Sequence, residues 1–428
     1  MAFSFGLREA GTTVRTELLA GLTTWLAMVY IVVVNPQILA TTGMDHGALF
    51  VATCIGAGIA SIAMGLYANY PLALAPGMGI NAYFAFTVVG EMKIPWQVAL
   101  GAVFLSGLLF LAVSVLRVRE WLINSIPLSL KLGIGAGIGF FLALIGLENM
   151  GLVVANPATL VTLGHVAAAP TLLGCAGFVV MAALSARGVA AAVLIGILAT
   201  AAAGIPFGLT TFHGFVALPP SLAPTLLQMD VRGALGLGVA SIVLTFFLVD
   251  VLDNAGTLIA VTHRAGLMRE DGVVPRLRQA LTADSGGAML GSMLGTSTVT
   301  GYIESAAGIE VGGRTGLTAV TTGVLFLATL FFAPLAIAIP GFATAPALVF
   351  VACLMARALR DGNWDDMTDS LPAMVIAIAM PFTFSITDGI GIGFIVYATV
   401  KALAGGWREV GSAVWVIAVA SALRFAML

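Results

Sequence analysis

Apolar residues fill most of the chain in long runs that short polar segments separate. Runs long enough for a membrane-spanning helix, which needs about 20 apolar residues, recur from one end to the other. They cover residues 17–34, 48–67, 96–116, 129–147, 169–185, 188–205, 234–262, 316–338, 345–359, 371–386, 388–404 and 411–427. This pattern predicts an all-α polytopic membrane protein, in which 411–427 is either an additional span or an interfacial helix.

Two further stretches are membrane-like but interrupted. Residues 71–86, PLALAPGMGINAYFAF, contain two prolines and two glycines, and residues 289–313 contain a Gly- and Thr-rich break that follows a short apolar run. Non-helical backbone at membrane depth is tolerated only where it is buried in protein or lines a cavity. Each break follows the second segment of its half. Such paired breaks indicate a transporter of two inverted repeats with its site at the interruptions.

The repeats are expected at 1–205, with segments one to seven, and at 234–428, with segments eight to fourteen. The longest candidate loops are 206–233 and 263–284. A cytoplasmic N-terminus places fifteen of the 18 Lys and Arg residues on the inner side, as the positive-inside rule requires. The expected location is therefore the cytoplasmic (inner) membrane.

Composition supports the membrane assignment and excludes other classes. Hydrophobic residues make up 60% and charged residues 9% of the chain, whereas soluble domains carry about 25% charged residues. A net charge of −2 and the lack of a basic domain argue against a nucleic-acid partner. The three cysteines are isolated, and no metal-binding or cofactor-binding motif occurs. We therefore expect no metal and no cofactor.

Two aspartates, Asp250 and Asp253, lie within the apolar run FFLVDVLDNAGTL. An aspartate at the centre of a membrane helix costs about 2.5–3.5 kcal/mol on insertion scales. No Lys or Arg of this segment precedes His263 to neutralise them. Residues three apart lie about 60° from each other around a helix, so the two carboxylates share a face. Burial and mutual repulsion disfavour ionisation of both groups, which suits them to take up a proton or to accept N–H donors.

Glu304 and Asn81 hold matching places in the two broken stretches. Glu304 follows the break in GYIESAAGI, and we expect it in the first turn of a half-helix. Asn81 supplies a donor and an acceptor, although it could instead only cap a half-helix. Asn35-Pro36 is interpreted as a helix-ending turn. Four carboxylates near segment ends are expected to be solvated, namely Glu17, Glu148, Glu310 and Asp388.

The motifs NPQIL, ALAPGMGINAYFAF, VDVLDNAGTLIAV and TSTVTGYIESAAGIEVGGRTGLTAV resemble the AzgA-like branch of the nucleobase–cation symporter 2 family. These are purine permeases for adenine, guanine and hypoxanthine, and the resemblance covers almost the whole chain. It implies fourteen segments in two inverted seven-segment repeats, with a short strand and a half-helix in segments three and ten. It also implies a core domain, 17–116 with 234–338, that moves against a gate domain, 129–205 with 345–428.

The resemblance also implies the roles of individual residues. Asp250, Asp253, Glu304 and Asn81 would bind the purine, with Thr257 nearby in the aspartate motif. An aromatic residue, Phe84, Phe86 or Tyr83, would cover the ring. The three acids are the candidates for proton coupling, with sodium the less favoured ion. The family usually has Thr at position 254, where this chain has Asn254, so substrate preference within the branch stays open. A homodimer is implied as well.

Three alternatives remain. The same architecture could carry another nucleobase, uracil or xanthine. It could also carry an anion, but an anion carrier favours a positive or neutral site rather than three deep acids. An intramembrane enzyme or a channel is disfavoured, because both close aspartates lie on one helix and no zinc motif occurs.

Overall fold

The computed structural model describes residues 5–115, 126–212, 214–236, 239–267 and 275–426, and their side chains except those of 115, 251–256, 259–260, 263–264 and 358. The chain forms two compact units. The first contains Met1–Leu116 and Val179–Thr344, and the second contains Arg117–Phe178 and Ala345–Leu428. Residues 179–205, expected in the gate domain, thus belong to the first unit. The division into core and gate domains stays a prediction.

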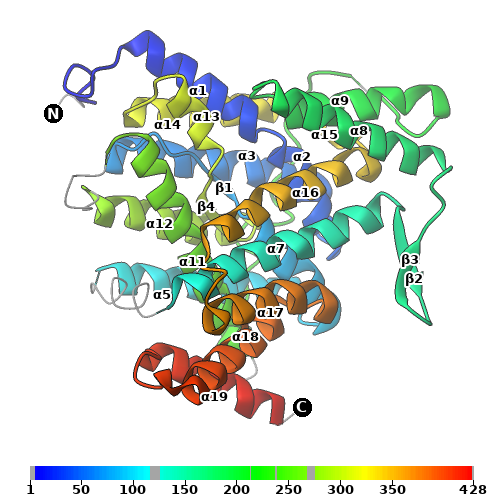
Figure 1. Cartoon of the computed structure of the whole chain (residues 1–428). Coiled ribbons are helices and arrows are strands. Elements are labelled where there is room, and N and C mark those ends of the chain that lie inside the picture. The colour runs from blue at the N-terminus through cyan, green and yellow to red at the C-terminus, as the bar shows by residue number, and fades with distance from the viewer. Residues whose placement is uncertain (1–4, 116–125, 213, 237–238, 268–274, 427–428) are drawn as a thin grey trace. The chain divides into compact units, whose positions relative to one another are not determined.

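The elements follow one another along the chain as Figure 1 shows. In the first 235 residues they are α1 (Val14–Met28), α2 (Ile31–Ala40), α3 (His46–Ala63), η1 (Met64–Ala68), β1 (Leu74–Pro76), α4 (Met78–Ala82), η2 (Tyr83–Glu91), α5 (Trp96–Val115), α7 (Leu128–Asn149), β2 (Val153–Asn156), β3 (Leu160–Leu163), α8 (Ala169–Ala186), α9 (Ala192–Ala203), η3 (Ile205–Phe207) and α10 (Val231–Ala234). After them come α11 (Ala240–Arg264), α12 (Leu277–Leu294), β4 (Val299–Gly301), α13 (Ser305–Glu310), α14 (Gly316–Thr329), η5 (Leu330–Phe332), α15 (Ala333–Ala338), α16 (Gly341–Ala356), η6 (Arg357–Asp361), α17 (Met367–Thr383), α18 (Ile386–Lys401), η7 (Ala402–Gly406) and α19 (Ser412–Ala426).

The predicted membrane helices are present. Each of the twelve uninterrupted apolar runs contains helix. Within the described residues, eight helical spans are long and apolar enough to cross a bilayer, and four shorter apolar helices accompany them. The protein is therefore a multi-pass membrane protein, whereas a count of fourteen segments is not fixed by these helices.

Two elements differ from the expectation. The candidate loop 263–284 is wrong in its second part, because α12 begins at Leu277 and runs for 18 residues. A full helix thus precedes the second break, in place of a short apolar run. Between α7 and α8, β2 and β3 form an antiparallel hairpin that pairs Val153 with Leu163. An Asn-Pro turn signal flanked by Val and Leu, VVANPATLVTL, is typical of such a hairpin.

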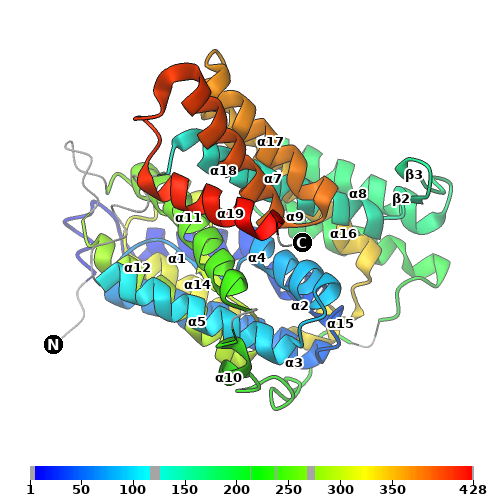
Figure 2. The same cartoon turned by 90° about the horizontal axis from the view of Figure 1, so that it is seen from below.

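Small residues allow the helices of the first unit to pack closely. A Cβ on Gly323 of α14 would lie 2.5 Å from the carbonyl oxygen of Gly58 on α3, and a Cβ on Gly58 would lie 3.1 Å from that of Gly323. Close backbone approach at small residues is how membrane helices gain van der Waals contact. The same unit packs α1 on α14 and α5 on α12; Figure 2 shows the second pair side by side.

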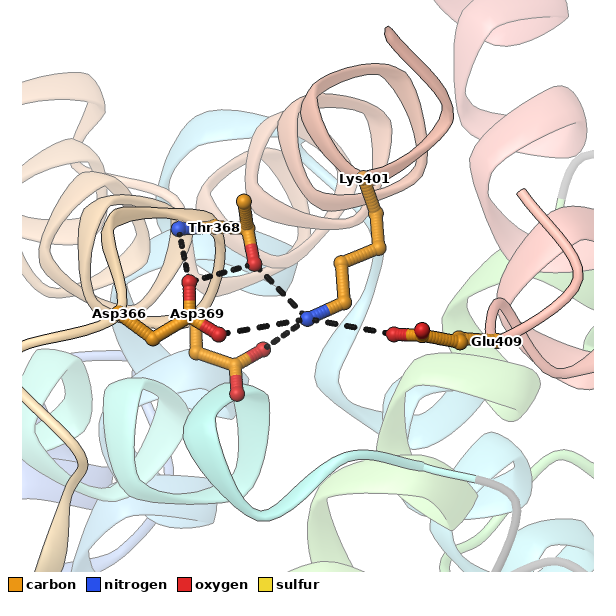
Figure 3. A network of polar contacts seen from close by, with 5 residues as sticks. All are labelled: Asp366, Thr368, Asp369, Lys401 and Glu409. Atoms are coloured by element: carbon orange, nitrogen blue, oxygen red, sulfur yellow. Dashed lines mark hydrogen bonds and ion pairs between the residues drawn. The ribbon is translucent and has the colours of Figure 1, made fainter. Parts of the chain in front are cut away.

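In the second unit, α17 packs against α7 and α18, and α19 packs against α18. Lys401, at the end of α18, lies at the centre of a polar network with Asp366, Thr368, Asp369 and Glu409 (Figure 3). Its Nζ donates to Thr368 Oγ1 at 2.8 Å and lies 3.4 Å from Asp369, 3.6 Å from Asp366 and 3.7 Å from Glu409. The lysine is only 12% exposed, so this network fixes the start of α17 to the end of α18.

Candidate functional site

The two interrupted stretches meet in the first unit. Strands β1 and β4 pair antiparallel, with Leu74 opposite Gly301 and Pro76 opposite Val299, and both strands are buried. Each strand leads into a short helix, α4 after β1 and α13 after β4. Pairing satisfies backbone groups that a broken helix would otherwise leave exposed at membrane depth. The strand and half-helix implied for each break are therefore present.

Serine hydroxyls complete the backbone hydrogen bonds at the start of β1. Ser61 Oγ of α3 donates to the Leu74 carbonyl at 3.0 Å and accepts from the Leu74 amide at 2.9 Å. Ser305 is the first residue of α13, and its Oγ accepts from the Ala73 amide at 3.0 Å. These partners come from α3 and α13, so two separate helices anchor the start of β1.

Asn81 lies near the end of α4 and is completely buried. Its side chain does not cap the half-helix, which begins after Gly77 without a side-chain cap. Instead, Nδ2 donates to Oδ1 of Asn35. The helix-ending turn expected at Asn35-Pro36 is wrong as well, since both residues lie inside α2 and are buried. Neighbouring polar groups make such a proline tolerable in a membrane helix.

Asp250 is 2% exposed and lies on α11, which packs against α4, β4 and α13. It accepts from Thr298 Oγ1 at 3.5 Å. Ser297, the residue before Thr298, has a left-handed backbone conformation with φ +64°. Its two neighbours bind different partners: Thr296 Oγ1 accepts from Asn35 Nδ2, and Thr298 Oγ1 donates to Asp250. Non-glycine residues held in this conformation concentrate at functional sites.

The rest of the aspartate motif is only partly described. The side chains of Asp253 and Asn254 lie outside the described residues. Thr257 is buried, at 8% exposed. The roles of Asp253 and Thr257 in substrate binding therefore remain predictions from the sequence.

Aromatic rings pack beside Asp250. Phe246, one turn earlier on α11, contacts Tyr83 in an edge-to-face arrangement with ring centroids 5.0 Å apart, and Phe84 at 6.4 Å. Phe84 is completely buried. In this conformation the expected ring-covering residue is thus part of an aromatic cluster that joins η2 to α11.

Glu304 is the N-cap residue of α13, one position before the expected first turn, and is half-buried. The hydroxyl of Tyr30, which precedes α2, donates to its Oε1 at 2.7 Å. A carboxylate at a helix N-terminus is stabilised by the free amides and the dipole. Glu304, Asn81 and Asp250 are therefore held by the same pair of broken segments.

A fourth acid was not identified from the sequence. Asp284, on α12, is completely buried, and its Oδ1 accepts from the Gly301 amide at 3.1 Å and from Thr300 Oγ1 at 3.2 Å. Asp284 thus binds β4, the strand of the second break. Its place in an expected loop concealed it, and the available signal was a lone acid in the run ALTADSGGAML.

The expectation for carboxylates at segment ends is wrong for Glu17. This residue is completely buried and accepts from the amides of Arg314, Thr315 and Thr318 at 2.9, 3.3 and 3.2 Å. It therefore caps α14 from α1, where free amides and the dipole favour a carboxylate. Glu148 and Glu310 are exposed as expected. Asp388 is partly exposed and pairs with Arg424 at 2.9 Å.

Comparison with known proteins gives the family. The model described as Permease family matches residues 15–392. The adenine permease AdeP of Escherichia coli (strain K12) is 49% identical over 424 residues, which cover 99% of this chain and 95% of the relative. The guanine/hypoxanthine permease PbuG of Bacillus subtilis (strain 168) is 44% identical over 436 residues, covering 99% of each chain.

Solved structures show the fold. The transmembrane domain of the cyanobacterial bicarbonate transporter BicA matches with a TM-score of 0.66 at 16% identity, over 89% of this chain and 97% of that one. The murine anion transporter Slc26a9 in its inward-facing state matches with a TM-score of 0.69 at 10% identity, over 91% and 68%. At such identities the likeness concerns architecture alone. The sequence relatives of this chain, in contrast, show its family. The chain belongs to the permease family and is a membrane transporter of the nucleobase–cation symporter group, as its motifs indicated.

Proposed function

We propose that the protein imports the purine nucleobases adenine, guanine and hypoxanthine by proton symport. The observation that carries this proposal is the convergence of Asp250, Glu304 and Asn81 on one pair of broken segments. Relatives at 49% and 44% identity are named as adenine and guanine/hypoxanthine permeases, which supports a purine as the substrate.

The chemistry of these groups suits a neutral heterocycle. Carboxylate oxygens accept the N–H groups of a purine edge, and an amide adds a donor or an acceptor. In the proposed site Asp253 and Thr257 act with Asp250 on α11, and Phe84 covers the ring face. A buried carboxylate is costly while ionised. One of the three acids, Asp250, Asp253 or Glu304, therefore takes up the proton that accompanies the purine.

The proposal includes a finer architecture. Fourteen segments form two inverted repeats of seven, and core and gate domains move against each other. The antiparallel pairing of β1 with β4 supports an inverted relation between the halves. The N-terminus lies in the cytoplasm, the protein resides in the inner membrane, and two copies form a homodimer.

An anion is the weaker candidate, although the fold is shared with a bicarbonate transporter. Asp250 is buried on α11, and Glu304 already occupies the N-terminus of α13 with its own negative charge. An anion at this place would meet like charges. Uracil and xanthine present N–H groups to the same acceptors, so competition must distinguish them from adenine, guanine and hypoxanthine.

Uptake in a bacterium that lacks its own purine permeases tests the proposal. Cells expressing the protein should concentrate radiolabelled adenine, guanine or hypoxanthine, and a proton-collapsing uncoupler should abolish the accumulation. Excess unlabelled uracil, xanthine or bicarbonate should compete poorly. Accumulation that survives the uncoupler but requires sodium would replace the proton as the coupling ion. Absence of purine uptake by protein present in the membrane would overturn the proposal.

A further inference from the structure

Four buried side chains from four separate segments form a continuous hydrogen-bonded network. Asn35 of α2 donates from Nδ2 to Thr53 Oγ1 of α3 and to Thr296 Oγ1, both at 2.7 Å. Asn81 of α4 donates to Asn35 Oδ1. All four residues are 0% exposed. The network therefore connects both interrupted stretches with the helices that surround them.

The direction of every bond in this network follows from one backbone carbonyl. The single hydrogen of the Thr53 hydroxyl is committed to the Leu49 carbonyl at 2.7 Å. Towards Asn35 the hydroxyl can then only accept, so Asn35 must present its NH₂ group there. Its oxygen consequently faces Asn81, and Asn81 must answer with its own NH₂ group. The same logic leaves Asn81 Oδ1 as the outer end of the network.

Asn81 Oδ1 is a buried acceptor that no described residue satisfies. Nearly all buried polar atoms have a partner, and an orphaned one indicates a functional role or a missing ligand. We infer that Asn35, held by Thr53, is a positioning residue that fixes Asn81 with its carbonyl oxygen as the group offered to the purine. This inference rests on the proposed function and assigns Asn81 the role of a pure acceptor for a purine N–H.

The two threonines provide a matched pair of variants. Among the described residues, the Thr296 hydroxyl bonds to no backbone carbonyl. It lies 3.2 Å from Thr53 Oγ1 and can turn to donate or to accept. Thr53→Val removes the group that sets the direction, and both amides can then reverse. Thr296→Val removes one hydrogen bond of the same network but leaves the direction set by Thr53. Both changes preserve the volume of the side chain.

Adenine and hypoxanthine are suitable probes, because their donors and acceptors are exchanged. Adenine has an acceptor at N1 and a donor amino group on C6, whereas hypoxanthine has a donor N1–H and an acceptor oxygen on C6. The measurement is the ratio of their affinities for purified protein in detergent, together with the ratio of KM values for uptake. Thr53→Val should change this ratio at least about tenfold, as expected when a buried donor and acceptor are mismatched. Thr53→Ser, which keeps the hydroxyl, should restore the wild-type ratio, and Thr296→Val should leave it unchanged.

A purely structural role for the network predicts a different outcome. Both valine variants would then lose stability or transport to a similar degree, with an unchanged ratio between the two purines, and the inference would be overturned. The same holds if Thr53→Val and Thr296→Val shift the ratio equally. Wild-type protein that takes up no purine would instead overturn the proposed function, so the two failures are distinguishable.

Discussion

The hydroxyl of Tyr30 donates a 2.7 Å hydrogen bond to Oε1 of Glu304, across 274 residues of sequence. The bond joins the residue just before α2 to the N-cap of α13. It holds one carboxylate oxygen in place while the side chain stays half-buried. This geometry makes Tyr30 a residue that orients Glu304, and the sequence contained no sign of the pair.

We expect Glu304→Gln to abolish purine uptake or reduce it severely, because an amide cannot ionise and carries a donor NH₂ group in place of one acceptor oxygen. Tyr30→Phe removes only the orienting bond and should raise KM by roughly three- to tenfold, the factor that corresponds to a typical hydrogen bond of about 0.5–1.5 kcal/mol. Initial uptake rates, corrected for protein in the membrane, measure both. Normal uptake by Glu304→Gln would remove this residue from the site.

The interruptions could be predicted from the sequence because Pro, Gly and Thr break helical periodicity at fixed positions. Pro76 and Gly77 mark where β1 ends, and Gly295 marks where α12 ends ahead of β4. The strand pairing itself joins residues more than 220 apart, and local sequence does not encode that contact. The family resemblance implied a short strand in each break, but not the pairing of the two strands.

Polar residues with distant partners were misinterpreted for the same reason. From the sequence, Glu17 was expected to be a solvated residue at a segment end, but in the structure it accepts hydrogen bonds from amides of the Arg314–Thr318 segment. Asn35, which precedes a proline, was expected in a helix-ending turn, but its side-chain amide donates to Thr53 and Thr296. The helix α12 carries Arg, Asp and Ser residues among its apolar ones, so hydropathy alone indicated a loop. In each case, tertiary contacts outweigh the local signal.

Asp284 should matter for the integrity of the paired breaks. Asp284→Ala leaves the Gly301 amide and the Thr300 hydroxyl without their buried acceptor. Hydrogen bonds to a charged group contribute about 1.5–3 kcal/mol, so we expect a clear loss of thermal stability in detergent. Asp284→Asn retains an acceptor oxygen and should lose less. Glu91→Ala, at the exposed end of η2, serves as a control for losing an acid elsewhere in the unit.

The cluster around Lys401 makes a prediction about pH. Hydrogen bonds from the Thr368 hydroxyl and amide, followed by the charge of Lys401, hold the pKa of Asp366 below its usual value. A depressed pKa in the folded protein means that the group stabilises the fold above its unfolded pKa, about 3.9, and loses that effect as pH falls through the folded value. The melting-temperature difference between wild type and Asp366→Asn should thus be present at neutral pH and shrink below about pH 4. A constant difference would contradict this account.

Membrane orientation can be tested in a variant without the native cysteines at 54, 175 and 353. Single cysteines at Arg276 or Arg278, both exposed at the start of α12, should be protected from an impermeant thiol reagent in intact cells. Cysteines at Phe215 or Leu218, both strongly exposed, should be labelled. The assignment of the basic residues to the inner side requires this result. The opposite labelling pattern would reverse the proposed topology.

Coupling gives the last prediction. If a carboxylate of α11 is protonated when the purine binds, binding takes up a proton, and apparent affinity must fall as pH rises through the titration of that group in the free protein. Linkage requires equally that the purine favours protonation of the same carboxylate. Purine binding to purified protein should therefore weaken from about pH 6 to about pH 8, the range open to a carboxylate whose ionisation burial disfavours. Asp250→Asn should flatten this dependence if Asp250 carries the proton. The dependence should persist in that variant, and vanish in Asp253→Asn or Glu304→Gln, if one of the other acids carries it. Affinity that does not change with pH in the wild type would mean that these carboxylates bind without titrating, and sodium would then be the first ion to test.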